Sequence, residues 1–199
     1  MSLSGEQRSL VLDLARSFVR GALEGVAPAL PEKLQPFLHE PAGCFVSLHA
    51  LEGHQLRGCV GRIDASQSLL ESLRAASTNV LADPRFALNP VRLDELPRLS
   101  IEVSVLSAPR PVSSPLNFEP TQHGIFLTID NRTGCFLPQV ARETGWTREQ
   151  LLDRLCVEKL ALPAPSWRSP QALLQVFSVQ VIGPEPFSVS RFNPLTVPI

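Results

Sequence analysis

The chain lacks the patterns that mark several common classes of protein. It contains no run of about 18 apolar residues, so we expect no membrane-spanning segment. Its 18 basic residues are balanced by 19 acidic ones, and the basic residues do not cluster. Binding of nucleic acid needs a concentrated positive surface, so we expect none here.

The beginning of the chain lacks the charged region and unbroken apolar core of a secretory signal, so we expect a cytoplasmic protein. The cysteines show neither a CxxC pair nor the spacing of zinc ligands; they are Cys44, Cys59, Cys135 and Cys156. Cytoplasmic cysteines are normally reduced, so we expect free thiols. The motifs of serine hydrolases and of nucleotide-binding enzymes are absent as well.

The histidines give little support to a metal site. Only His49 and His54, which flank a predicted turn, could come together, and two histidines without a third ligand make a weak site. We therefore expect neither a metal ion nor a cofactor.

The patterns that are present indicate a soluble α+β protein. Helical periodicity that begins with a capping box predicts three helices, at 4–25, 68–81 and 147–160. Short apolar or alternating runs predict strands at 44–50, 55–63, 99–107, 124–130, 135–138 and 173–182. The strands do not alternate regularly with helices, which favours a mainly antiparallel sheet flanked by helices.

The segment LRGCVG, residues 56–61, is unusual for a strand because Gly58 and Gly61 bracket Cys59. Glycine in a strand often marks a place where a ligand or another backbone approaches closely. Arg57 lies two residues from Cys59, on the same predicted face, where a cation would favour the thiolate. The alternative is a buried cysteine with a bulge nearby and an arginine that reaches a surface carboxylate.

The strand at 99–107 carries Glu102 and Ser104 on its polar face. If this strand pairs near 55–63 with matching faces, both side chains would share a surface with Cys59. Glu102 could then orient Arg57 or act as a base. An ordinary solvated strand face is the alternative.

The segment DPRF, residues 83–86, is typical of the end of a helix, because a residue that precedes proline resists the helical conformation. We interpret Asp83 and Arg85 as a local ion pair and Phe86 as a core residue.

Four segments in this order resemble the AMMECR-type domain family, also called AmmeMemoRadiSam system protein A. They are LRGCVG at 56–61, DPRF at 83–86, LSIEVSVLSAP at 99–109 and GCFLPQVARETGW at 134–146. The resemblance covers nearly the whole chain. The family more often has a small hydroxyl residue at the position of Cys135, so the resemblance implies no specific role for that residue.

The resemblance implies a larger lobe, about 1–109 and 172–199, and a smaller lobe, about 110–171, with a cleft between them. It also implies two partners, a Memo-type protein and a radical S-adenosylmethionine enzyme. It supplies no established reaction.

Two functional hypotheses follow. In the first, the protein is a component of a modification system that acts on a small or peptide-like substrate through Cys59, with Arg57 and Glu102 assisting and Gln139 binding the substrate. In the second, the protein is a non-catalytic binding module whose cleft holds a partner segment or a small ligand, with Gly58 and Gly61 permitting close approach.

Overall fold

The structure is a computed structural model that describes residues 2–28, 30 and 34–188. The remaining residues include 189–199, which the sequence assigns to the larger lobe and which lie outside the described residues. None of the described helices is long and apolar enough to cross a membrane.

The chain divides into two compact units. Unit 1 consists of the residues up to Leu106 and those from Gln180 onward, and unit 2 is Ser107–Val179. Both units combine helices with antiparallel strands, which confirms the predicted α+β fold class. The lobe boundaries implied by the family resemblance, near 109 and 172, differ from this division by three residues at the first boundary and eight at the second.

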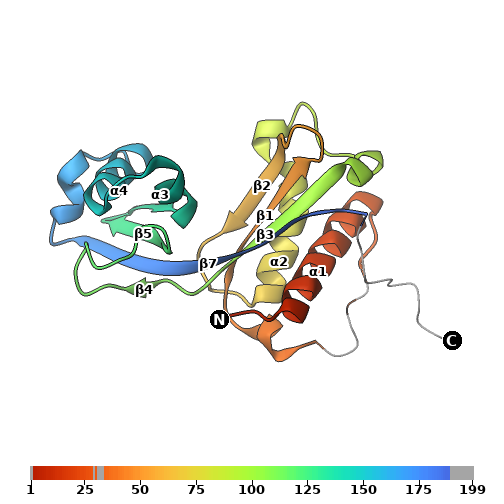
Figure 1. Ribbon diagram of the computed structural model, residues 1–199, viewed down its shortest axis with the longest axis horizontal. Coiled ribbons are helices and arrows are strands. Elements are labelled where there is room, and N and C mark those ends of the chain that lie inside the picture. Colours follow the sequence, from red (N-terminus) through yellow and green to blue (C-terminus); the bar gives the residue numbers. More distant parts are fainter. Residues whose placement is uncertain (1, 29, 31–33, 189–199) are drawn as a thin grey trace. The chain divides into compact units, whose positions relative to one another are not determined.

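Unit 1 is built on an antiparallel sheet (Figure 1). Its strands, in spatial order, are β2 (Leu56–Arg62), β1 (Gly43–Ala50), β3 (Leu99–Leu106) and the last part of β7 (Ala172–Pro186). Because β2 comes first in this order, it is an edge strand, and one side of its backbone has no strand partner.

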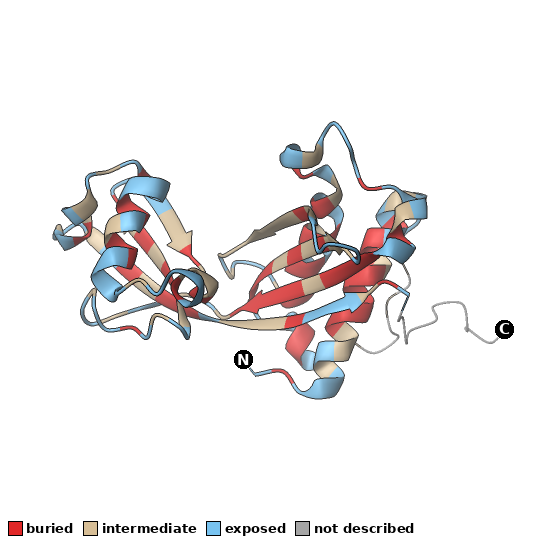
Figure 2. Ribbon diagram, turned by 45° about the horizontal axis from the view of Figure 1, so that its top comes forward, coloured by how far each residue is buried: buried red, intermediate tan, exposed pale blue. Residues whose placement is uncertain are grey.

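Two helices, α1 (Gly5–Glu24) and α2 (Leu69–Asn79), pack on one face of this sheet (Figure 1). Each begins with the capping box expected from the sequence, at Ser4 and at Ser68. The apolar strand residues alternate toward the helices, and their burial is visible in Figure 2. These buried residues include Cys44, Val46, Leu48, Ile101, Val103 and Val105.

The alternation directs a second set of side chains to the opposite face of the sheet. They are Phe45, Ser47 and His49 on β1, Cys59 and Gly61 on β2, and Ser100, Glu102 and Ser104 on β3. This face therefore carries Cys59 and Glu102, the two candidate reactive residues.

Short helical turns complete unit 1. They are η1 (Pro36–His39), η2 (Val80–Ala82), η3 (Pro84–Phe86) and η4 (Leu93–Arg98). The turns η2 and η3 follow α2 directly and lie against β2, so they bring the DPRF segment to the sheet edge.

Unit 2 contains a hairpin and several short helices. Its strands are β4 (Arg110–Pro111), β5 (His123–Ile129), β6 (Arg132–Phe136) and the first part of β7, and its helical segments are α3 (Pro138–Thr144), α4 (Arg148–Leu155), the π-helical turn η5 (Cys156–Leu160) and η6 (Ala164–Arg168). Leu127, Leu152 and Trp167 are among the residues that form a separate apolar core.

Two predictions in this unit are wrong in detail. The hairpin turn lies at Asp130 and Asn131, because Ile129 pairs directly with Arg132 and Asp130 adopts a positive φ of 52°. The strand predicted at 135–138 therefore begins earlier, at Arg132. It ends at Phe136 because Pro138 begins a helix, where its missing N–H causes no loss.

Candidate functional site

Three partly exposed polar side chains form a row across the face of the unit 1 sheet that is directed away from the helices. Cys59 of β2 pairs with Ser47 of β1, and Ser47 pairs with Glu102 of β3. The Ser47 hydroxyl donates a hydrogen bond to the Cys59 sulfur, with 3.1 Å between Oγ and Sγ. Cys59 and Glu102 thus share a face, as the sequence predicts, but their strands are not neighbours. The sequence hypothesis depended on 99–107 pairing near 55–63, and the two strands do not pair directly because β1 lies between them.

The next row contains Gly61, Phe45 and Ser104, paired in the same order. A Cβ atom on Gly61 would lie 2.5 Å from Cγ of Phe45, so the aromatic ring occupies the space beside the glycine. On the other face of β2, a Cβ atom on Gly58 would lie 2.7 Å from the carbonyl oxygen of Val80. Both glycines therefore have a packing reason within the chain, and a ligand-binding role for them stays a prediction.

Arg57 forms its hydrogen bonds with residues other than Cys59. Its guanidinium donates two hydrogen bonds to the Glu95 carboxylate, of 2.6 Å from Nε and 3.0 Å from Nη2. The same Nη2 donates to the carbonyl of Asn89 at 3.2 Å. Among the described residues, no hydrogen bond or ion pair joins Arg57 to Cys59. The Arg57 guanidinium holds the pKa of Glu95 below its usual range, since the bonds favour the carboxylate.

A bulge in β2 explains this orientation. Leu48 pairs with Gly58 and His49 pairs with Leu56, so Arg57 has no partner on β1. An unpaired extra residue bends the strand and redirects its side chain. The alternative interpretation of the sequence, a bulge with an arginine that reaches a surface carboxylate, agrees with the bulge and with the carboxylate partner of Arg57, although the side chain of Glu95 is only 21% exposed. It is not correct for Cys59, which is only partly buried.

The DPRF segment holds the backbone of Cys59. The Cys59 N–H donates to Oδ2 of Asp83 at 2.9 Å, and Nη2 of Arg85 donates to the Cys59 carbonyl at 3.1 Å. Arg85 also donates to both oxygens of Asp83, at 3.0 and 2.6 Å. These two side chains take the place that a neighbouring strand would have at the sheet edge.

The Asp83 carboxylate is 4% exposed, and its partners keep it charged. The Arg85 guanidinium holds the pKa of Asp83 well below its usual range, with help from the backbone N–H groups of Cys59 and Arg85. The predicted local pair of Asp83 and Arg85 is confirmed. Sequence reasoning missed its contact with Cys59, because no local pattern says which strand edge a turn will reach.

Phe86 differs from the expectation of a core residue. It is half-buried, and the guanidinium carbons of Arg57 and Arg85 each lie 5.8 Å from its ring centre. Phe86 thus links the two arginines that border Cys59, since cations are attracted to an aromatic face.

The other three cysteines are Cys44 and Cys156, which are buried, and Cys135, which is partly buried like Cys59. Burial raises the pKa of Cys44 to about 12 and also raises the pKa of Cys135 and Cys156. All four cysteines are free. Among residues 2–28, 30 and 34–188, no group of three or more histidine, cysteine or acidic side chains could hold a metal ion.

Gln139 belongs to α3 of unit 2, whereas the other candidate residues belong to unit 1. Its side-chain oxygen is buried and has no hydrogen-bond partner among the described residues. The convergence of Gln139 with Arg57, Cys59 and Glu102 on one cleft stays a prediction.

The profile of the AMMECR1 family matches residues 12–182. The chain belongs to the AMMECR1 family. Its relatives include Protein NEQ441 of Nanoarchaeum equitans, which is 34% identical over 175 residues that cover 84% of this chain and 95% of that protein. Protein MK0488 of Methanopyrus kandleri is 34% identical over 191 residues, which cover 92% and 91% of the two chains.

A solved structure supports the same assignment. The crystal structure of the uncharacterized protein PH0010 from Pyrococcus horikoshii matches with a TM-score of 0.77 and 28% sequence identity. The match covers 90% of this chain and 92% of that one. The names of these relatives state no activity, so the comparisons establish the family and the fold.

Proposed function

We propose that this AMMECR1-family protein is a thiol-dependent component of a modification system, with Cys59 as the nucleophile. The observation that carries the proposal is the hydrogen bond from Ser47 to the Cys59 sulfur, in a row that continues to Glu102. A hydroxyl donor stabilises negative charge on sulfur, and a nucleophile needs a nearby proton acceptor.

Each residue has a distinct part in this proposal. The Cys59 thiol transfers its proton to Glu102 through a bridging water molecule, because β1 separates their strands. Its sulfur then adds to a carbonyl carbon of the substrate, the π electron pair of the C=O bond moves to the oxygen, and that oxygen takes up the proton from Glu102. Ser47 stabilises the Cys59 thiolate through its hydrogen bond to the sulfur. Asp83 and Arg85 fix the backbone of Cys59, and Arg57 is a positioning residue that anchors the bulge through Glu95.

The substrate and the partners are proposed on other grounds. The family resemblance supports a cytoplasmic system that includes a Memo-type protein and a radical S-adenosylmethionine enzyme. The polar side chains beside Cys59, which include Ser104, suit a small or peptide-like substrate. A substrate-binding role for Gln139 is proposed on the family resemblance alone.

A second candidate is a non-catalytic binding module, in which the same surface holds a partner segment or a small ligand. The pairing of Arg57 with Glu95 favours it, because that pairing removes the cation expected to activate Cys59.

Cysteine labelling separates the two candidates. We expect iodoacetamide at neutral pH to modify Cys59 faster than the other three thiols, because only the thiolate reacts and burial raises the pKa values of the others. Ser47→Ala should slow the labelling of Cys59. The matched control is Ser100→Ala, which alters a serine on the same face outside the row.

Mass spectrometry gives the labelling rate of each cysteine. These rates and the melting curve of Cys59→Ser distinguish the two candidates. The nucleophile proposal expects that variant to keep the melting temperature. Labelling of Cys59 that is no faster than that of the other thiols, combined with a clear loss of stability in Cys59→Ser, would contradict the proposal and favour the binding module.

A further inference from the structure

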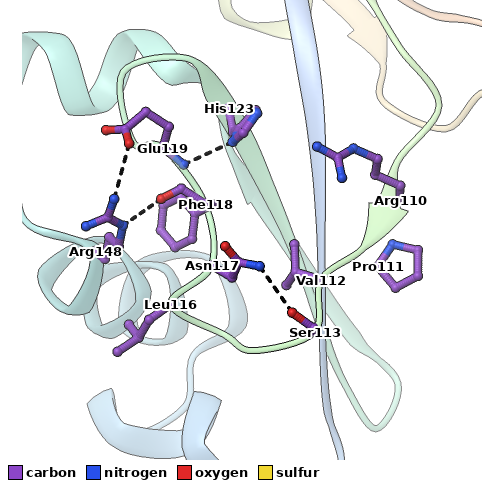
Figure 3. Close-up of a pocket in the computed structure, with 10 residues that line it drawn as sticks. All are labelled: Arg110, Pro111, Val112, Ser113, Leu116, Asn117, Phe118, Glu119, His123 and Arg148. Carbon is purple, nitrogen blue, oxygen red and sulfur yellow. Dashed lines mark hydrogen bonds and ion pairs between the residues drawn. The ribbon is translucent and has the colours of Figure 1, made fainter.

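Unit 2 contains a cavity of about 400 Å³ that no residue of the Cys59 row borders (Figure 3). It lies where β4 and the segment after it meet the start of β5 and the start of α4. Its lining consists mainly of polar side chains, among them Arg110, Asn117, Glu119, His123 and Arg148. No sequence pattern points to this cavity, because most of its lining comes from the proline- and serine-rich segment that follows β3.

The acidic group of the cavity is already neutralised. Nη2 of Arg148 lies 3.2 Å from Oε2 of Glu119, and Nε of the same arginine donates to the carbonyl of Phe118 at 2.6 Å. Figure 3 shows Arg148 directed toward these two residues. Arg148 therefore holds the segment that forms one wall, and its charge cancels the charge of Glu119.

His123 can donate a hydrogen bond from its ring to a ligand. Its Nδ1 accepts a hydrogen bond of 3.0 Å from the backbone N–H of Glu119, so the neutral ring carries its hydrogen on Nε2. No hydrogen bond of that Nε2 is formed within the described part of the chain. Asn117 also acts as a donor, through Nδ2 to Oγ of Ser113 at 3.1 Å.

Arg110 is the charged group without a partner. Its guanidinium forms no hydrogen bond or ion pair with any residue that the structure describes, and Figure 3 shows it extended from β4 toward the side on which His123 lies. Among the described residues, the lining thus offers one unpaired guanidinium, of Arg110, and one unpaired ring N–H, of His123.

We infer that this cavity binds a small molecule that carries a carboxylate or a phosphate group. The guanidinium of Arg110 matches the paired oxygens of either group, and the Nε2–H of His123 adds a second donor. The volume lies within the usual range for small-molecule sites, about 300–1,000 Å³. The inference rests on unit 2 alone, so it does not depend on a nucleophilic Cys59.

Amide NMR of the full chain tests the inference, with sodium phosphate and sodium acetate as separate probes and sodium chloride at equal ionic strength as the reference. We expect at least one of the two anions to cause saturable shifts confined to residues 110–123 and 148. The anion that binds more tightly identifies the preferred head group.

Two variants and a control make the test specific. Arg110→Gln should weaken binding by on the order of tenfold or more, because it removes a charged donor pair. Arg110→Lys should have a smaller effect, since it keeps the charge and loses only the forked geometry. Arg154→Gln, on the exposed side of α4 and paired with Glu158, should leave binding unchanged.

Three results would overturn the inference. They are shifts that rise linearly without saturation for both anions, equal shifts with chloride, and saturable binding that Arg110→Gln does not weaken.

Discussion

Two arginines beside the candidate sites, Arg57 in unit 1 and Arg110 in unit 2, have opposite environments. In unit 1, Arg57 and Arg85 beside Cys59 are each bound by a carboxylate, of Glu95 and of Asp83. In unit 2, Arg110 borders a cavity and has no acidic partner among the described residues. A guanidinium that is paired within its own chain positions the backbone, whereas an unpaired one at a cavity is available to a ligand. In the sequence, Arg57 and Arg110 both lie beside glycine or proline, so their neighbours do not reveal which of them is paired.

A second contrast lies within unit 1. Two ion pairs of this unit, Asp83–Arg85 and Asp64–Arg62, each join residues two positions apart. In each, Nη2 of the arginine lies 2.6 Å from Oδ2 of the aspartate. The Asp83 side chain is 3% exposed and binds Cys59, but that of Asp64 is 54% exposed and binds only its own loop. Burial, and not the length of the contact, should determine what each pair contributes to stability.

The largest expected effect comes from Asp83→Ala. This change leaves the Cys59 N–H without its partner at the sheet edge and removes a buried charge from Arg85, so we expect the free energy of unfolding to fall by about 3 kcal/mol. Asp64→Ala is the matched control and should cost less than about 1 kcal/mol, because its pair is exposed to solvent. Urea denaturation measures the unfolding free energy of both variants. Equal losses of stability would contradict the difference between the buried and the exposed ion pair.

An intermediate effect is expected from Arg57→Ala. The change leaves the largely buried Glu95 without a bidentate partner and releases the bulge, which should lower the free energy of unfolding by about 2 kcal/mol. The corresponding change in unit 2, Arg110→Ala, should stay within about 0.5 kcal/mol, because that side chain has no partner to lose. Arg110→Ala as damaging as Arg57→Ala would contradict the opposite roles assigned to the two arginines.

A smaller effect is expected from pH. The folded state holds the pKa of Asp83 below the value of about 3.9 in the unfolded chain, so its stabilising contribution is fully present above that value and is lost as the pH falls below it. The difference in unfolding free energy between wild type and Asp83→Ala should therefore be constant near neutral pH and narrow by about 1 kcal/mol at about pH 3. Denaturation series at several pH values check this, and a difference that widens in acid would refute the role of Asp83.

Much of the fold could be predicted from local patterns. The capping residues Ser4, Ser68 and Thr147 mark the starts of three helices, and the alternation at 99–107 identifies which residues face the helices. These signals are local, since a helix cap and a strand alternation each depend on a few neighbouring residues.

The candidate site depended on long-range contacts, which is why less of it could be predicted. Ser47 had no local feature to single it out, and it became important only because β1 lies between β2 and β3. The bulge that turns Arg57 toward Glu95 is a property of the pairing of two strands. The cavity of unit 2 lies along a segment without periodicity, where local patterns carry little information.

Under the proposed function, Ser47 supports the Cys59 sulfur through its hydrogen bond, and Arg57 only positions the backbone of β2. The rate of iodoacetamide labelling at Cys59 in Ser47→Ala and in Arg57→Gln, measured below the melting temperature of each variant, tests this assignment most directly. We predict that Ser47→Ala slows the labelling and that Arg57→Gln leaves it nearly unchanged while lowering the melting temperature. Slower labelling in Arg57→Gln with an unchanged rate in Ser47→Ala would contradict the account and return the activation of Cys59 to the arginine.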